Sequence, residues 1–272
     1  MDKESVFSIG RNGNGKCIYC YKSENTSRKI LSSMKIKFCS IGSFNDPLEN
    51  TLQHFFIDED LKVKNLEKKR LLNILKKNLS EYYNENCRAL CFTQDKPMSD
   101  ETMISQAHRG YMRFRMWSQY ADNGKGICFI LDKEKADNAF KKLMIQKDIF
   151  YCNDSVKYSD NYGDSKVFSF KISDLLAMNK GTDIISSKIK KYYKNYFFTK
   201  RIDWSEENEY RYFAFTDKEL FLDISNLLVG IVLGYYSSKK IKDFACEKLS
   251  SKKIPICKIF LQGCHAYIRG VI

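Results

Sequence analysis

Apolar and polar positions follow two periods along this chain, and both recur from one end to the other. Repeats of three to four residues predict helices. The predicted helices cover 23–34, 58–84, 101–123, 133–147, 184–198 and 238–250. Alternating or continuous apolar runs predict strands at 16–22, 35–40, 88–93, 125–131, 155–159, 211–216, 227–236 and 254–261. Helices and strands intermix without a regular strand–helix–strand alternation. We therefore expect an α+β fold with a mixed or antiparallel sheet flanked by helices.

No change in composition marks a boundary between domains. The start of the chain is rich in glycine and asparagine, which predicts a flexible leader over 1–16 and a single α+β domain over 17–272. Within the second predicted helix, Leu72, Leu75 and Leu79 share one face and are expected to be buried.

The composition is that of a globular protein. The chain has 272 residues, of which 43% are hydrophobic and 29% charged, and these values exclude a disordered chain, a collagen-like repeat and a coiled coil. No apolar run approaches the ~18 residues that a membrane helix needs, and the first residues lack the apolar segment of a signal peptide. Most of the ten cysteines lie in apolar, strand-like segments, where cysteine behaves as a small buried hydrophobe. We expect a reduced, cytoplasmic protein with no membrane partner.

The net charge is +13, from 46 lysines and arginines against 33 acidic residues. This surplus favours RNA or DNA as a partner, although a solvated lysine-rich surface also explains it. Two segments combine cations with aromatic residues, a composition found where single-stranded nucleic acid binds. Their candidate nucleic-acid-binding residues are Lys188, Lys190, Lys191 and Lys194 in the first and Arg109 and Arg113 in the second. An amphipathic helix that buries its tyrosines explains the first segment equally well.

An acidic motif, W-S-E-E-N-E-Y-R at 204–211, is the first candidate for catalysis. Glu207 and Glu209 are two residues apart at the start of a predicted strand, so both carboxylates are expected on one side. The alternative is a solvated acidic turn with Arg211 as an internal ion-pair partner. If the pair lies exposed in a cleft, the substitution Glu209→Gln is expected to remove activity with little effect on folding.

Two further motifs could contact a ligand. The sequence S-F-N-D-P-L-E at 43–49 places Asn45 and Asp46 before a proline, which is typical of an Asx turn and also of a binding loop. Trp117 and Tyr120 are three residues apart on a predicted helix and share a face. They would stack on an aromatic ligand or, alternatively, pack in the core.

The sequence offers no standard metal or nucleotide motif. Cys17 and Cys20 form the only C-x-x-C, and the three histidines lack paired ligand spacing, so no metal site is expected. No P-loop, G-x-G-x-x-G, G-x-S-x-G or H-E-x-x-H occurs.

Three segments carry a resemblance that extends over about residues 17–235. They are KIKFCSIGSFNDPLE at 35–49, MWSQYADNGKGICF at 116–129 and FFTKRIDWSEENEYRYF at 197–213. Together they resemble a bacterial family catalogued as domain of unknown function 2971, whose members are regarded as stand-alone cytoplasmic proteins, some linked with phage defence. The layout is distantly similar to toxin-type ADP-ribosyltransferases. Those enzymes carry an Arg or His on an early strand, a Ser or Thr in the middle and an E-x-E before a late strand.

The resemblance implies roles for particular residues. It makes Glu207 and Glu209 the catalytic pair, NAD the cofactor, and Thr93 or Ser118 the middle element. The candidate cofactor-binding residues are Tyr19, Tyr21, Asn45, Asp46, Thr93, Trp117, Ser118 and Tyr120.

The early strand departs from the pattern of these transferases. Tyr19, Tyr21 and Lys22 stand where Arg or His is expected, so Arg28 or His54 would have to substitute.

The leading hypothesis is an NAD-dependent ADP-ribosyltransferase-like enzyme that modifies a macromolecule, nucleic acid or protein. It would act in phage defence or as a toxin, with a protein antitoxin or phage trigger as partner. Cleavage of the nicotinamide–ribose bond develops oxocarbenium character, which a carboxylate stabilises. The alternatives are a non-enzymatic nucleic-acid-binding module and a magnesium-dependent nuclease that uses Asp46, Glu49, Glu207 and Glu209.

Overall fold

The computed structural model describes residue 7 and residues 15–50, 56–96, 106–161, 169–176 and 182–271. Its helices are α1 (Glu24–Ser33), α2 (Pro47–Asn50), α3 (Asn65–Asn86), α4 (Phe114–Tyr120), α5 (Lys133–Gln146), α6 (Ile172–Leu176), α7 (Thr182–Phe197) and α8 (Lys239–Leu249). Most of the leader predicted for 1–16 lies outside the described residues.

The strands alternate with these helices in no regular order. They are β1 (Cys17–Lys22), β2 (Lys35–Lys37), β3 (Cys39–Ser40), β4 (Phe56–Asp58), β5 (Cys87–Thr93), β6 (Ile127–Asp132), β7 (Phe150–Ser155), β8 (Lys157–Tyr158), β9 (Ser169–Lys171), β10 (Thr199–Lys200), β11 (Glu209–Phe215), β12 (Phe221–Asp223), β13 (Leu228–Leu233), β14 (Ile256–Gln262) and β15 (His265–Gly270). The main sheet has the order β15-β14-β13-β6-β1-β5-β11-β7, and β3 also pairs with β5. Its neighbours are antiparallel except β13 and β14, which run parallel. The predicted α+β fold with a mixed sheet is therefore confirmed.

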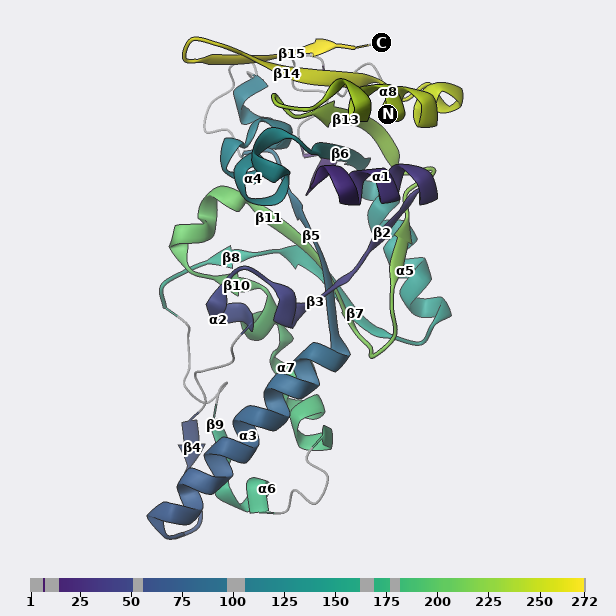
Figure 1. Ribbon diagram of the computed structural model, residues 1–272. Helices are drawn as coiled ribbons and strands as arrows, with labels where there is room; N and C mark the ends of the chain where they lie inside the picture. Colours follow the sequence, from purple (N-terminus) through teal and green to yellow (C-terminus); the bar gives the residue numbers. More distant parts are fainter. Residues whose placement is uncertain are drawn as a thin grey trace.

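The main sheet is weakly joined at its centre. β1 pairs with β6 along its whole length but with β5 at a single residue pair, Tyr19 with Thr93. Beyond that pair the two strands diverge. We call β15, β14, β13, β6 and β1 the β1 half-sheet, and β5, β11 and β7 the β5 half-sheet. Figure 1 shows β14 and β15 at one end of the molecule, and β5 and β11 running obliquely away from them through its middle.

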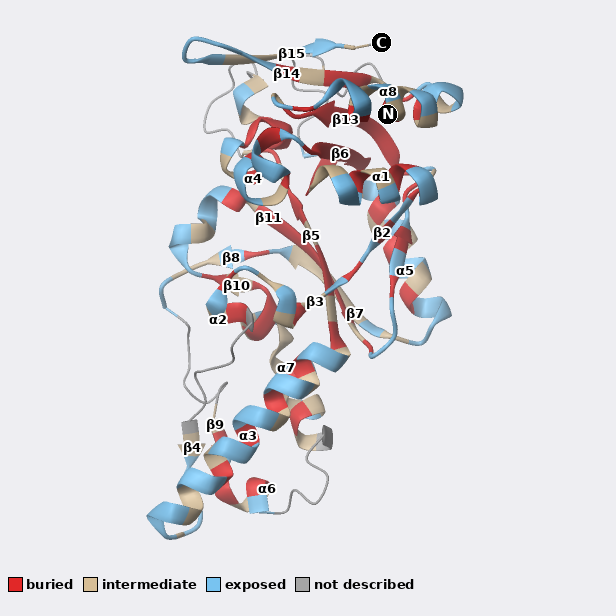
Figure 2. Cartoon of the chain, in the orientation of Figure 1, coloured by how far each residue is buried: buried red, intermediate tan, exposed pale blue. Residues whose placement is uncertain are grey.

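The two faces of the sheet are covered differently. Because strand side chains alternate between faces, Ile18 and Tyr212 face one continuous core, which α1, α5 and α8 complete. On the opposite face the core is divided. One cluster joins α3 and α7 to β5 and β11, and the other joins α4 to the β1 half-sheet. Figure 2 shows the sheet strands buried and the outer side of α3 exposed. The divided core leaves space beside the point where β1 and β5 separate.

Several predicted elements differ from the observed ones. The strand predicted at 35–40 is two short strands: β2 pairs with β12, and β3 pairs with β5. The helix predicted over 58–84 begins at Asn65, and its buried face contains Leu71 rather than Leu72. Six of the described strands were not predicted: the short strands β4, β9, β10 and β12, and the edge strands β7 and β15 of the main sheet, none of whose described residues is buried.

The predicted long helix over 101–123 is wrong. Residues 101–105 lie outside the described part, and the remainder forms short 3-10 turns followed by α4. Gly110 lies against β1 so closely that a Cβ at this position would fall 2.1 Å from the ring of Tyr19. The backbone at Gly110 therefore packs directly on the Tyr19 ring, where a side chain would not fit.

Candidate active site

A cavity of about 600 Å³ lies where β1 and β5 diverge. Its walls come from β1, β5 and α4, from the loop that leads into α2, and from the segment between β10 and β11. A cavity of this size is in the range used for small-molecule and cofactor binding.

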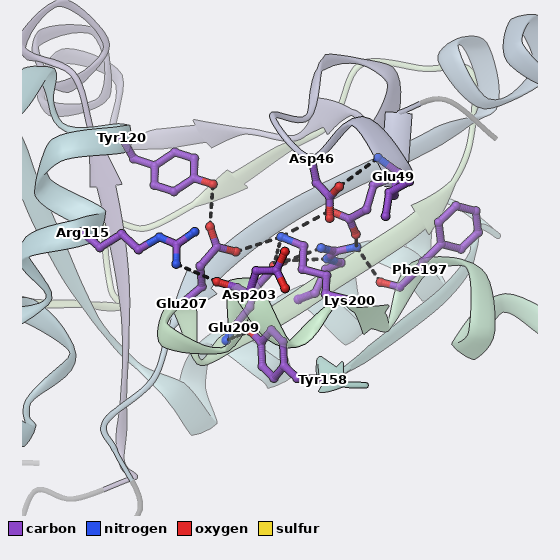
Figure 3. Close-up of polar contacts among 12 residues, drawn as sticks. Asp46, Glu49, Arg115, Tyr120, Tyr158, Phe197, Lys200, Asp203, Glu207 and Glu209 are labelled. Carbon is purple, nitrogen blue, oxygen red and sulfur yellow. Dashed lines mark hydrogen bonds and ion pairs between the residues drawn. The ribbon is translucent and has the colours of Figure 1, made fainter. Parts of the chain in front are cut away.

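A buried cluster of charged residues forms one wall of this cavity (Figure 3). The Nζ atom of Lys200 lies 2.8 Å from Glu207, 2.9 Å from Glu209 and 3.2 Å from Glu49. Arg211 binds both carboxylate oxygens of Glu209, at 2.6 and 3.0 Å, and lies 2.7 Å from Glu49. All five side chains are at most 5% exposed.

Four different local structures bring these residues together, and the first is α2, which contains Glu49. Glu209 and Arg211 lie two apart on β11 and so share a face, and the backbone N–H of Glu209 donates to the Tyr158 hydroxyl at 2.9 Å. Lys200 lies on β10, which pairs with β8. Glu207 ends a 3-10 helix, η8 (Ile202–Glu207), and is not part of the strand.

The predicted common side of Glu207 and Glu209 is observed, but the geometry behind it is different. Between them Asn208 adopts a left-handed conformation, with φ 42°, which turns the chain from η8 into β11. Both carboxylates still line the cavity. The pair is neither exposed in a cleft nor part of a solvated turn, because Glu207 and Glu209 are 2% and 4% exposed.

The cations control the ionisation of these carboxylates. Burial alone would raise the pKa of Glu209, but Arg211 and Lys200 hold that pKa well below its usual range. Burial raises the pKa of Glu49, although both cations oppose the increase. The hydroxyl of Tyr120 donates to Glu207 at 2.8 Å, and burial together with the negative charge of Glu207 raises the pKa of Tyr120. Glu209 is therefore an ionised group, and Tyr120 a neutral donor, at neutral pH.

Most of the candidate cofactor-binding residues line the same cavity. They are Tyr19, Tyr21 and Thr93 from β1 and β5, Asn45 and Asp46 from the loop before α2, and Ser118 and Tyr120 from α4. Asp46 also accepts from the backbone N–H of Leu48 at 2.8 Å, as expected for an Asx turn. The Thr93 hydroxyl oxygen is buried and has no hydrogen-bond partner among the described residues.

Trp117 does not belong to this set. Its side chain is completely buried, its indole N–H donates to the backbone carbonyl of Tyr111 at 2.8 Å, and its ring packs edge-on against Tyr21. The core alternative is therefore correct for Trp117, whereas Tyr120 reaches the acidic cluster.

Of the two substitutes proposed for the missing early-strand cation, only Arg28 lies in the described part of the chain, and it does not line the cavity. Arg28 pairs with Glu24 on α1 at 2.8 Å and is not one of the lining residues. His54 lies outside the described residues. Lys22, at the end of β1, does line the cavity.

Sequence reasoning missed Lys200, which contacts all three glutamates. Its signal was the Thr-Lys pair in the FFTKR segment, which contributed to the resemblance but suggested no role. From the sequence, Glu49 is a candidate only as a ligand-binding residue of the 43–49 motif and as a metal ligand in the nuclease hypothesis. Within the described ranges, no group of three or more His, Cys, Asp or Glu side chains is arranged to hold a metal ion. The ammonium group of Lys200 lies among the three glutamates.

The candidate nucleic-acid-binding residues are separate from the cavity. On α7, Lys190, Lys191 and Lys194 are exposed, and Lys188 is half-buried and donates to the backbone carbonyl of Ser169. None of these lysines is among the described residues that line the cavity.

The two arginines proposed for the second nucleic-acid-binding segment are buried. Arg109 is 2% and Arg113 is 7% exposed, and Arg109 lies 3.3 Å from the buried carboxylate of Asp95. Their burial contradicts a role at an exposed basic surface.

In the described part of the chain, no helix is both long and apolar enough to cross a membrane.

No curated protein and no solved structure matches the chain, so nothing in these comparisons supports the similarity to ADP-ribosyltransferases. Residues 116–212 match the family described as Protein of unknown function (DUF2971). The match is shorter than the resemblance over about residues 17–235. It runs from α4 to β11 and so includes Tyr120, Lys200, Glu207 and Glu209: this part of the chain is similar to the DUF2971 family.

Proposed function

We propose that the cavity binds NAD⁺ and that the acidic cluster promotes cleavage of the bond between nicotinamide and ribose, with transfer of ADP-ribose to a macromolecule. The observation that carries this proposal is the ionised Glu209 beside Glu207 in the wall of an aromatic-lined cavity. Carboxylates held in a water-poor site stabilise positive charge that develops on a sugar carbon.

The residues around the cavity fit such a substrate. The rings of Tyr19, Tyr21, Phe44 and Tyr120 line it and offer apolar surfaces for a heteroaromatic ring. The buried Thr93 hydroxyl has no partner among the described residues, so a sugar hydroxyl or an amide could satisfy it. The volume of about 600 Å³ suits a dinucleotide or a large part of one.

The chain's own residues divide the chemistry between them. Glu209, held ionised by Arg211 and Lys200, stabilises the positive charge at the ribose C1 atom as the C1–N bond breaks and its electron pair passes to the nicotinamide ring. Glu207 accepts the proton from the O–H or N–H of the acceptor as the new bond to C1 forms. Tyr120 and Lys200 each bind one oxygen of Glu207 and so fix its orientation.

Nucleic acid is the acceptor that the exposed lysines of α7 favour, because phosphates bind to such surfaces. The test uses NAD⁺ labelled in its adenylate part, mixed with wild-type protein and with RNA, DNA and protein fractions. We expect label to appear on one of these macromolecules and to be lost with Glu207→Gln. If Glu207→Gln transfers label as fast as wild type, the assignment of Glu207 is wrong.

A further inference from the structure

Buried acidic groups outnumber buried basic groups around the cavity. Four acidic side chains that line the cavity are buried, Asp46, Glu49, Glu207 and Glu209, whereas the buried basic groups next to them are Lys200 and Arg211. The cluster of Lys200, Arg211 and the three glutamates therefore carries an excess of one negative charge when every group is ionised, and Asp46 and the half-buried Lys22, which also line the cavity, add one charge of each sign. Uncompensated charge in a buried site is costly. Such a cluster stabilises itself by taking up a proton or by binding a cation.

Glu49 is the member suited to hold the proton. Its Oε1 atom accepts from Arg211, but its Oε2 atom lies 3.2 Å from Lys200, the longest of the three lysine contacts, and makes no hydrogen bond in the described structure. By contrast, Glu209 has both oxygens bound by Arg211. Burial also raises the pKa of Glu49. The charged groups around it are Arg211 and Glu209 of β11, Lys200 of β10, Glu207 of η8 and Asp46 before α2.

We propose that this cavity recognises its ligand through a cationic group, and that the ligand's positive charge replaces a proton that Glu49 holds in the empty site. The proposal rests on the proposed function only where it names the nicotinamide ring of NAD⁺ as that cation. The charge argument itself applies to any cation that reaches the cavity.

The exchange predicts how affinity depends on pH. Below the pKa of Glu49, binding must displace the proton, so affinity rises with pH by up to about tenfold per unit. Above that pKa, Glu49 is already ionised, and affinity becomes independent of pH. A ligand of the same shape without the positive charge displaces no proton, so its affinity does not rise in this way.

NAD⁺ and NADH provide a matched pair of probes, because they differ at the nicotinamide ring, which is cationic in the first and neutral in the second. We would titrate each into the full-length protein by calorimetry at several pH values. Each titration is repeated in two buffers of different ionisation enthalpy, and the difference between the two binding enthalpies gives the number of protons released. We expect NAD⁺ to bind at least about tenfold more tightly than NADH and to release up to one proton, whereas NADH releases none. Glu49→Gln, which resembles the protonated form, should bind NAD⁺ without proton release, and its circular dichroism spectrum checks its fold.

The outcomes separate the two proposals. Equal affinities without proton release would overturn the charge exchange and leave the proposed function intact. Failure of both dinucleotides to bind would contradict the proposed function. In that case N-methylnicotinamide, a cation, and neutral nicotinamide are compared in the same way, and equal or absent binding of the two overturns the exchange. A Glu49→Gln variant that is folded but still releases the proton would show that Glu49 is not its source.

Discussion

Glu209 illustrates how far one side chain in this cluster depends on its neighbours. It lies within 3.0 Å of Arg211 and Lys200 and is 4% exposed. A neutral residue at this position would break the two-oxygen contact with Arg211 and one contact of Lys200, and breaking a buried ion pair is strongly destabilising even though Glu49 and Glu207 remain beside the two cations. Folding must therefore be sensitive to Glu209, in contrast to what an exposed acidic pair would allow.

The first prediction is that Glu209→Gln lowers the free energy of unfolding by about 3–5 kcal/mol, measured by urea denaturation. The matched control is Glu206→Gln, on the same segment. Glu206 pairs with Lys96, and its side chain is 58% exposed, so this change should stay within about 0.5 kcal/mol. Equal unfolding midpoints for the two variants would contradict the buried ion pair.

The same contact predicts a dependence of stability on pH. The pKa of Glu209 is lowered in the folded protein, so its contribution is fully present above the unfolded value of about 4.3 and is lost as pH falls towards the folded value. The difference in unfolding free energy between wild type and Glu209→Gln should therefore shrink below about pH 4. A difference that stays constant from pH 7 to pH 3.5 would contradict the lowered pKa.

At the scale of elements, the helices and strands with a clear hydrophobic pattern were predicted from the sequence, and those with a weak pattern were missed. The strand at 125–131 and the helix at 133–147 are observed as β6 and α5, because β6 is buried throughout and α5 has one apolar face. The missed strand β7 is mostly half-exposed at the sheet edge, so its sequence does not alternate clearly.

One close contact between elements leads to the next prediction. Gly126 lies at the turn between α4 and β6, where a Cβ would fall 2.0 Å from the backbone oxygen of Lys22. Neither backbone can yield easily, so Gly126→Ala should lower stability by about 1–3 kcal/mol or more and disturb the α4 wall of the cavity. Gly270→Ala is the control, because nothing lies within 4 Å of its Cβ position. Thermal unfolding that is unchanged in Gly126→Ala would show that the contact is not tight.

At the scale of the whole molecule, the site combines distant parts of the chain. Glu49 and Arg211 are 162 residues apart in the sequence, and no periodicity predicts such a contact. The local motifs identified Asp46 and Tyr120, and the resemblance added Tyr19 and Thr93; all four line one cavity. Their common location depends on the single pairing of β1 with β5, which only the folded chain provides.

The exposed lysines of α7 lie apart from the cavity, so a nucleic-acid partner can be tested independently of catalysis. If RNA or DNA binds there, affinity should fall steeply with salt as counterions are released, and the triple change of Lys190, Lys191 and Lys194 to Glu should abolish binding. Filter binding at several salt concentrations measures this. A flat salt dependence, or unchanged affinity in the triple variant, would make these lysines a solvated surface.

The most direct test of the central claim is the rate at which the protein releases nicotinamide from NAD⁺, measured by chromatography. The comparison uses wild type, Glu207→Gln and the neighbouring control Glu206→Gln. Glu207 lines the cavity and binds Tyr120 and Lys200, whereas Glu206 is exposed. We predict release by wild type, a rate lower by about 10²–10³ in Glu207→Gln, and an unchanged rate in Glu206→Gln. No release by folded wild type in the presence of candidate acceptors, or equal rates in all three proteins, would contradict the account.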